Sequence, residues 1–497
     1  MISPSLIGRL LFGGPPPIPN TVRDDYEALF PEGLTMGTLI IGRPGTGKTS
    51  SLARHLLDYF MTYPERAIFV LDWSGSISNT ILYLITQQPK NIQLQLLNRV
   101  VYDELGNPEW VIPLPEFSQE YGFNYEEQVQ RVSTNLIKLQ PELVLGAPFV
   151  AGLAFREIAP QICRLLTAIL DEHNETWQIT EAKKMLVDPG LLKQALKKFG
   201  YKVPEAKWFL ENVFLQIRKD ERELRTYAFM AMLGTIEPRA VRARMGYYRP
   251  GWTPKEAIKK GLMVLVDGSR LINQRNTQHY LFTQAYSLIM AEINRRQPAD
   301  PNDRPVALVM DEVYSLLSIP GMAEEIGMLS PLYRSRKLEL YIVLQTLSQL
   351  APTLNEQIWS LGNIICFGIS NFDEAYKMAQ QLKEYDPQAI RLQSAHESGQ
   401  PITETDRGQY LKVANLIQRL RHRECIMRRF ESEQVMDKHV RYIAQTKEHP
   451  TGSFDDRLNV LKLRLLKERG VPVKDAIDLI NKRKRIKIGK KPPNLDN

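Results

Sequence analysis

The chain has 497 residues, of which 43% are hydrophobic and 24% charged, a composition typical of soluble globular proteins and sufficient for two to four domains. No apolar run reaches the roughly 18 residues of a membrane helix, so we expect neither a signal peptide nor a membrane anchor. Three widely separated cysteines argue against a disulfide framework or a zinc site and fit a reducing compartment. We therefore predict a cytoplasmic protein.

The net charge of +8 is concentrated near one end. Seven cations and no acids occupy the segment "KRKRIKIGKK" at 482–491, and without them 57 cations face 56 acids. A basic end of this kind is typical of an arm that contacts nucleic acid, and equally of a solvated, disordered terminus.

The first part of the chain alternates between strand and helix patterns. After a Pro-rich lead-in at 1–33, the stretch from 34 to 63 predicts a strand, a Gly-rich loop and an amphipathic helix. "RAIFVLDWSGS" at 66–76 predicts a second strand, and "RVVYDELGNPEWVIPL" at 99–114 predicts a β-hairpin with Gly-Asn-Pro as its turn. We assign 34–144 to the first part of an α/β domain.

Apolar residues at helical spacing dominate from about 145 to 257, which predicts an all-α insertion domain. Strand patterns return in "GLMVLVDGS" (261–269), "RPVALVMDEVYSLL" (304–317), "LELYIVLQT" (338–346) and "GNIICFGIS" (362–370). Strands that are apolar on both faces and separated by helices indicate a mostly parallel sheet flanked by helices. We assign 258–450 to the second part of this domain and 451–497 to a helical, basic C-terminal tail.

A phosphate-binding loop is indicated by "GRPGTGKT", which matches G-x-x-x-x-G-K-[ST] between a predicted strand and a predicted helix. Glycines let backbone N–H groups turn toward phosphates, and the helix N-terminus adds its positive dipole. Lys48 is expected to reach the β- and γ-phosphates and the Thr49 hydroxyl to bind Mg²⁺. The candidate nucleotide-binding residues are Gly42, Arg43, Pro44, Gly45, Thr46, Gly47, Lys48, Thr49 and Ser50.

Paired acids end the strand "ALVMDE" at 307–312. At the tip of a central strand, Asp311 can bind Mg²⁺ and Glu312 can polarise the attacking water, which supports hydrolysis. The same pair could also cap a helix.

A glutamine, Gln345, follows the apolar strand "YIVL" where an unpaired amide would be costly. If its strand lies beside the Asp311 strand, both carboxyl ends open on the same edge of the sheet. Gln345 could then bind the γ-phosphate or the attacking water and signal hydrolysis to the segment after it. The alternative is a structural amide that satisfies neighbouring backbone.

These three motifs together resemble the HerA/FtsK class of P-loop motor ATPases. "QTLSQL" (345–350) and "LGNIICFGISNFDEAYKMAQQL" (361–382) are most similar to conjugative coupling proteins of the TraG/TraD type, and the helical insertion lies where those proteins carry an all-α domain. The resemblance implies a RecA-like fold, a ring of self-associated copies (a hexamer), and ATP hydrolysis at subunit interfaces that drives DNA through a central pore. It also implies an arginine from the neighbouring subunit, for which Arg334 and Arg336 are the candidates, although both could be ordinary surface residues.

Two departures from that class concern the N-terminus. We expect none of the transmembrane helices with which membrane-bound coupling proteins begin, and we do not expect the 33 residues before the ATPase domain to form the small β-barrel of HerA. These departures count against docking to a secretion channel and against the nuclease partner of HerA, so the partner, a nuclease, a relaxase or a secretion channel, is left open. The nucleotide site is unaffected by either departure.

The leading prediction is an ATP-dependent DNA translocase that uses Mg²⁺. The basic, aromatic stretch "RAVRARMGYYRPGWTPKEAIKK" at 239–260 could contact DNA or form an ordinary domain junction. The alternatives are a nucleotide-gated assembly scaffold that recruits a nuclease or relaxase, and a DNA helicase.

Overall fold

A computed structural model gives the fold. It describes residues 37–138, 149–172, 178–234, 236–298, 302–313, 335–350, 358–382, 405–422, 424–428, 441–442 and 456–483, with isolated positions between 300 and 326. The lead-in at 1–33 and most of the basic segment 482–491 lie outside these residues.

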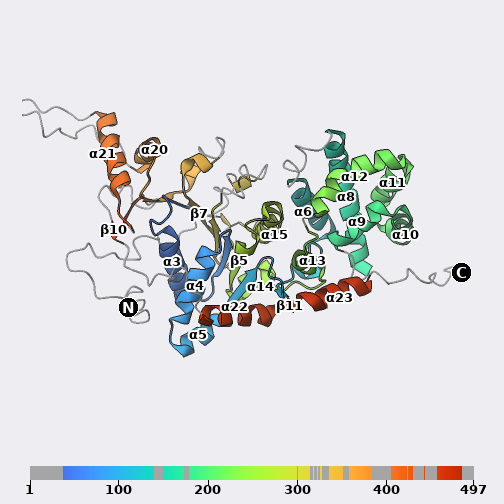
Figure 1. Ribbon diagram of the computed structural model, residues 1–497, viewed down its shortest axis with the longest axis horizontal. Coiled ribbons are helices and arrows are strands. Elements are labelled where there is room, and N and C mark those ends of the chain that lie inside the picture. Colours follow the sequence, from blue (N-terminus) through green and yellow to red (C-terminus); the bar gives the residue numbers. More distant parts are fainter. Residues whose placement is uncertain are drawn as a thin grey trace, which may run out of the picture.

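A central sheet organises the described part of the chain (Figure 1). It has nine strands in the order β10-β9-β8-β1-β7-β6-β2-β5-β3. Neighbours from β8 to β3 pair in parallel, whereas β9 and β10 at one edge pair antiparallel. The strands are β1 (Thr38–Ile41), β2 (Ala67–Asp72), β3 (Val100–Glu104), β4 (Trp110–Val111), β5 (Met263–Asp267), β6 (Val306–Asp311), β7 (Leu338–Leu344), β8 (Asn363–Phe367), β9 (Glu424–Arg428), β10 (Arg441–Tyr442) and β11 (Val471–Pro472).

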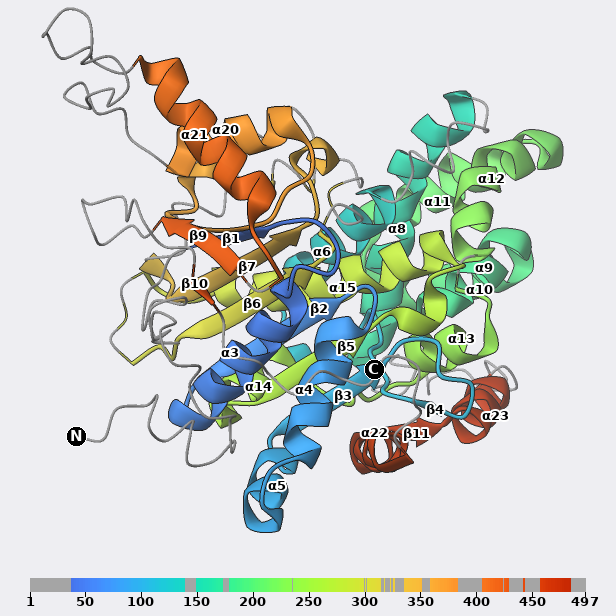
Figure 2. The same cartoon turned by 60° about the vertical axis from the view of Figure 1, so that its left-hand side comes forward.

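The strands are apolar on both faces because helices flank the sheet (Figure 2). Every residue of β1, β2, β5, β6, β7 and β8 is buried. The α-helices are α3 (Lys48–Thr62), α4 (Ser76–Thr86), α5 (Lys90–Leu97), α6 (Tyr125–Lys138), α8 (Phe149–Glu172), α9 (Ile179–Val187), α10 (Pro189–Phe199), α11 (Pro204–Asn212), α12 (Lys219–Gly234), α13 (Arg239–Gly246), α14 (Pro254–Lys260), α15 (Arg275–Asn294), α20 (Phe372–Leu382), α21 (Asp406–Arg419), α22 (Asp456–Arg469) and α23 (Val473–Arg483).

The region predicted as an insertion is helical throughout its described residues. From α8 to α14 these residues form α-helices and short 3₁₀ helices but no strand. Helices α8 to α12 gather at one end of the molecule, away from α3 and α21 (Figure 1). The domain boundaries at 145 and 257 remain predictions.

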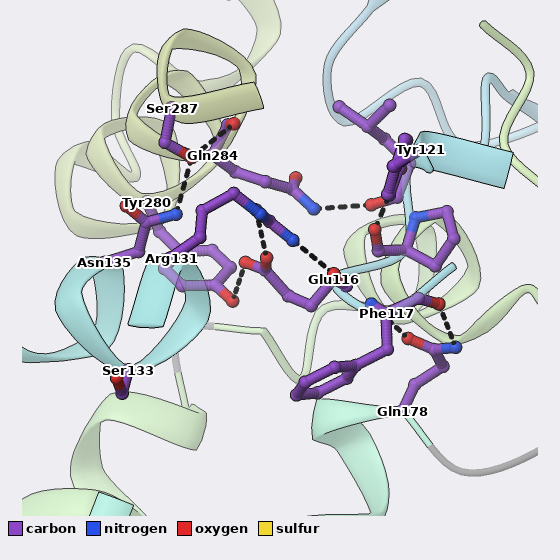
Figure 3. A network of polar contacts seen from close by, with 12 residues as sticks. Glu116, Phe117, Tyr121, Arg131, Ser133, Asn135, Gln178, Tyr280, Gln284 and Ser287 are labelled. Atoms are coloured by element: carbon purple, nitrogen blue, oxygen red, sulfur yellow. Dashed lines mark hydrogen bonds and ion pairs between the residues drawn. The ribbon is translucent and has the colours of Figure 1, made fainter. Parts of the chain in front are cut away.

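A buried polar network joins the segment after β4 to α6, to α15 and to the start of α9 (Figure 3). Glu116, in the segment after β4, accepts hydrogen bonds from Arg131 of α6 at 3.0 Å and from Tyr280 of α15 at 2.6 Å. Gln178, just before α9, donates to the carbonyl of Phe117 at 2.8 Å. Glu116 is fully buried, so its ion pair with Arg131 and its hydrogen bond from Tyr280 connect the segment after β4 with α6 and α15.

The hairpin predicted at 99–114 is wrong. Strand β3 instead pairs in parallel with β5, and the two-residue β4 pairs antiparallel with β11 near the C-terminus. Strand β3 is buried along its whole length, which suits an edge of the central sheet covered by α22. The Asn107 side-chain oxygen accepts the N–H groups of Glu109 and Trp110, so the turn closes on itself without bringing the strands together.

Two residues of the basic, aromatic stretch at 239–260 face the protein interior. Arg244 and Trp252 are both buried and both donate to Asp103 of β3, at 2.6 and 3.1 Å. Neither side chain is therefore available to nucleic acid in this arrangement.

The C-terminal segment packs against the rest of the protein. Helix α22 lies against β3 and α4, and α23 lies against α13. Within the described residues, we find no helix whose length and apolar content would let it cross a bilayer.

Candidate active site

The phosphate-binding loop lies at the carboxyl end of β1, between the ends of β7 and β8. The Gly42 N–H donates to the Leu344 carbonyl at 3.3 Å, and the Arg43 N–H donates to the Gly368 carbonyl at 2.9 Å. A Cβ on Gly42 would lie 2.6 Å from the Phe367 Cβ, so the close approach of loop and strand requires glycine here. The loop predicted from the motif therefore has its expected place between a strand and a helix.

Side chains within the loop stabilise its turn. Thr46 Oγ1 donates to the Arg43 carbonyl at 2.8 Å, and Ser50 Oγ donates to the Gly47 carbonyl at 3.1 Å. Gly47 is in the left-handed region at φ 98°, which starts α3 at Lys48. Arg43, Pro44 and Gly45 are exposed at the tip of the loop, where His422 Nδ1 contacts the Gly45 carbonyl at 2.5 Å.

Lys48 is folded onto the inside of this loop, with Thr49 half-buried beside it. Its ammonium donates to the carbonyls of Gly42 and Arg43, the latter at 3.0 Å. Burial lowers the Lys48 pKa to about 8, although the charges of Asp311 and Glu312 oppose this shift. The lysine and both acids are therefore close enough to interact electrostatically, while their catalytic roles stay predictions.

Asp311 and Glu312 lie at the carboxyl end of β6. Strand β7 alone separates β6 from β1, which brings these acids to the loop. Burial and the neighbouring Glu312 charge raise the Asp311 pKa to about 7. The Lys48 charge and hydrogen bonds to the carboxylate have the opposite, smaller effect. Burial likewise raises the Glu312 pKa. Glu312 has φ 51°, a left-handed conformation that is uncommon for a residue with a side chain and is found at functional sites.

Gln345 reaches across from β7 to the paired acids. The register of β6 and β7 confirms that these strands are neighbours. Gln345 Nε2 donates to Glu312 Oε1 at 3.2 Å, and its backbone N–H donates to Gln349 Oε1 at 3.1 Å. Ser348, in the turn after it, donates its N–H to Glu374 of α20 at 3.0 Å. The amide that follows the apolar strand is thus paired with the glutamate, and the next turn is tied to α20.

The two candidate arginines do not join this cluster. Arg334 lies outside the described residues. Arg336 precedes β7, at the end of that strand opposite Gln345, and its side chain donates to the carbonyls of Ile293, at 3.2 Å, and Asn294. It therefore caps the C-terminus of α15 within its own chain, and a role in a neighbouring copy stays a prediction.

The sequence analysis missed two further carboxylates at the same edge. Asp72 ends β2 and Asp267 ends β5, and the sheet register places Asp72 beside both Asp311 and Asp267. Both are fully buried, and burial together with these neighbouring charges raises the Asp72 pKa. The signal was present in the sequence, because three of the predicted parallel strands end in Asp.

Comparisons with known proteins show similarity in structure but not in sequence. No family model and no curated protein matches the chain. Among solved structures, the plasmid coupling protein TrwB in complex with ADP and Mg²⁺ is 14% identical, with a TM-score of 0.53 over 84% of this chain and 87% of that one. VirB4 of Thermoanaerobacter pseudethanolicus is 14% identical, with a TM-score of 0.45 over 82% of this chain and 89% of that one. The TrwB similarity confirms the predicted RecA-like α/β fold, and the chain resembles a plasmid coupling protein in fold.

Proposed function

We propose that the protein is an ATP-dependent DNA translocase, a ring-forming motor that hydrolyses ATP with Mg²⁺. The observation that carries the proposal is the cluster of Lys48, Asp311, Glu312 and Gln345 at one edge of the sheet, because it combines phosphate binding with a hydrogen-bonded candidate base. The fold shared with a plasmid coupling protein supports the DNA-translocating part. TrwB binds ADP and Mg²⁺, which supports the same ligands here.

The residues present fit a magnesium nucleotide. Thr49 offers a hydroxyl and Asp311 a carboxylate, both hard oxygen donors of the kind Mg²⁺ prefers. Among the described residues, no group of three or more His, Cys, Asp or Glu side chains could bind a metal alone. This matches Mg²⁺, which is usually bound through one or two protein oxygens together with substrate phosphates and water.

Each residue has a distinct role in this mechanism. The loop N–H groups and the N-terminus of α3 bind the phosphates, and Lys48 neutralises their charge. Bound Mg²⁺ would polarise the phosphoryl oxygens. Glu312 accepts a proton from the attacking water, and its raised pKa makes it a stronger base near neutral pH. Gln345 holds the Glu312 carboxylate in place and links it to the turn that contacts α20.

A neighbouring copy would complete the site with an arginine, which stabilises charge on the transferred phosphoryl group. Arg334 and Arg336 are both retained for this role. Arg336 would have to give up its bonds to the end of α15. Mixing a Lys48→Ala chain with an Arg334→Ala or Arg336→Ala chain tests this directly. Activity recovered in the mixture identifies the arginine that acts in trans.

ATP turnover with and without DNA tests the proposal as a whole. We expect DNA to stimulate the wild-type rate and Lys48→Ala to abolish turnover. Glu312→Gln should retain ATP binding but stop both hydrolysis and DNA movement. The matched control is Glu205→Gln, which also removes a carboxylate charge but on α11, in the helical region. Turnover that no DNA stimulates, in a sample shown to form a ring, would contradict a motor. If Glu312→Gln supports function through assembly alone, the protein is a scaffold instead.

A further inference from the structure

The turn that joins α21 to β9 lies against the tip of the phosphate-binding loop. Its residue His422 contacts the Gly45 carbonyl oxygen through Nδ1, at a distance of 2.5 Å. Because a carbonyl oxygen can only accept a hydrogen bond, Nδ1 carries the hydrogen and donates it. The two residues are 377 positions apart in the sequence. The phosphate-binding loop therefore has a contact that its own motif does not include.

Contacts with the end of β8 hold this turn in place. Gln418, in the last turn of α21, donates to the Ser370 carbonyl at 3.0 Å. A Cβ on Gly368 would lie 3.1 Å from the Leu420 carbonyl oxygen, so the backbone of the turn packs closely on the chain that leaves β8. His422 is therefore presented to the loop from backbone whose position is fixed by neighbouring elements.

The hydrogen bond from His422 sets the orientation of one peptide group in the loop. A peptide group is planar and trans, so the Gly45 carbonyl and the Thr46 N–H point in opposite directions. Since the carbonyl faces His422, the N–H faces away from it. Thr46 is 3% exposed, and nothing in the described part of the chain accepts its N–H. A buried N–H without a partner is rare, and in a loop of this kind it is a donor for a phosphate oxygen.

The same peptide group has few other restraints. Gly45 has φ 76°, and a Cβ placed on it would meet no atom within 4 Å. Glycine adopts positive and negative φ with similar ease, so this peptide could rotate at little cost. The Thr46 hydroxyl donates to the Arg43 carbonyl and leaves the Gly45 carbonyl free to turn. Across the described residues, only His422 donates a hydrogen bond to the Gly45 carbonyl.

We propose that His422 is a positioning residue of the phosphate-binding loop, which holds the Gly45–Thr46 peptide so that the Thr46 N–H faces a nucleotide phosphate. The inference rests on the proposed function, which places the phosphates of ATP in this loop. It adds the α21–β9 turn to a site that otherwise consists of the loop, the paired acids and Gln345. His422 acts through the backbone of the loop, so its removal should weaken the binding of the phosphates.

Binding of fluorescent, ribose-labelled ADP and ATP to the full-length protein measures this effect without relying on turnover. One hydrogen bond contributes roughly 2- to 10-fold in affinity, and we expect His422→Ala to weaken both nucleotides by about fivefold. His422→Asn should restore most of the affinity, because the Asn amide nitrogen is bonded to Cγ as Nδ1 is in histidine. His422→Gln, whose amide nitrogen lies one bond further out, should not. A loss of less than about twofold in His422→Ala would overturn the inference, as would equal rescue by Asn and Gln.

Pyrophosphate separates a positioning role from direct contact with the base or ribose. It lacks both groups but still requires the N–H donors of the loop. We expect His422→Ala to weaken the displacement of labelled ADP by pyrophosphate by the same factor as it weakens ADP itself. A variant that binds pyrophosphate like wild type and yet binds ADP poorly would show that His422 contacts the nucleoside, which would overturn the inference.

The control is Arg421→Ala, one position earlier in the same turn. The N–H of Arg421 donates to Glu424 at 2.7 Å and is unaffected by the change. This variant should bind both nucleotides like wild type, and a loss equal to that of His422→Ala would reduce the effect to general charge and overturn the inference. Failure of the proposed function looks different. If the wild-type protein binds labelled ATP and the His422 variants behave as expected, but no DNA stimulates turnover, the proposed function fails and the inference stands.

Discussion

Replacing Asp311 by Asn should stabilise the protein while it abolishes ATP hydrolysis. Asp311 is 4% exposed, and burial with the adjacent Glu312 charge raises its pKa from 3.8 to about 7. Keeping Asp311 ionised in the folded protein therefore costs on the order of 4 kcal/mol. Asn has nearly the same shape without the charge. Loss of one carboxylate oxygen as an acceptor returns about 1 kcal/mol, so we expect a net gain of roughly 3 kcal/mol.

The pH dependence gives this prediction its sign. The folded protein keeps a proton on Asp311 up to a higher pH than the unfolded chain does, so this residue costs stability as the pH rises from about 4 through 7. The melting temperatures of wild type and Asp311→Asn should therefore nearly coincide at pH 4 to 5 and separate by several degrees at pH 8. Thermal melts without nucleotide or Mg²⁺ at a series of pH values measure this. A variant that melts below wild type at pH 8, or a difference independent of pH, would refute the reasoning.

Three other outcomes are expected. The rate constant kcat/KM should fall below pH about 7, as Asp311 gains a proton, and above pH about 8, as Lys48 loses one, in a pH–rate profile. Asp103→Asn should destabilise the fold by about 3–5 kcal/mol in urea denaturation, because it leaves the Arg244 charge buried without its partner. Gln345→Ala should lower kcat with little change in KM in steady-state assays, because Gln345 holds Glu312 and not the loop.

The candidate site residues could be selected from the sequence because each of them stands in a local motif. "GRPGTGKT" fixes a strand, a loop and a helix in a row, and strands ending in Asp-Glu and in Gln345 need only be parallel neighbours to meet it. Apolar residues on both faces indicated a buried parallel sheet, whereas the sheet order shows that β6 and β7 are neighbours. The motif analysis did not select Asp72 and Asp267, since their place at this edge depends on which strands pair in the sheet.

Long-range strand pairing explains why the hairpin prediction at 99–114 was wrong. The segment at 99–114 contains the alternation and turn residues of a hairpin, yet its two strands pair with β5 and β11, which lie more than 150 and 350 residues further along the chain. In the stretch at 239–260, for which the sequence left a DNA contact and a domain junction open, Arg244 and Trp252 are buried and donate to Asp103. Local pattern cannot distinguish a basic residue that faces solvent from one whose acidic partner is distant in sequence.

The same long-range contacts explain how a helical region can be inserted without disturbing the site. The chain leaves the sheet after β3 and returns at β5, and these two strands are direct neighbours in the sheet. Arg244 then ties the last part of the excursion to Asp103 of β3, and the ion pair of Glu116 with Arg131 ties its beginning to Tyr280 of α15. Both ends are therefore held by buried charge pairs on the β3–β5 side, whereas the loop, the paired acids and Gln345 lie across β1, β7 and β6. Asp72, at the end of β2, and the turn at 73–76 that follows it lie between these two sides. The nucleotide site and the attachment of the helical region therefore occupy different strands of one sheet.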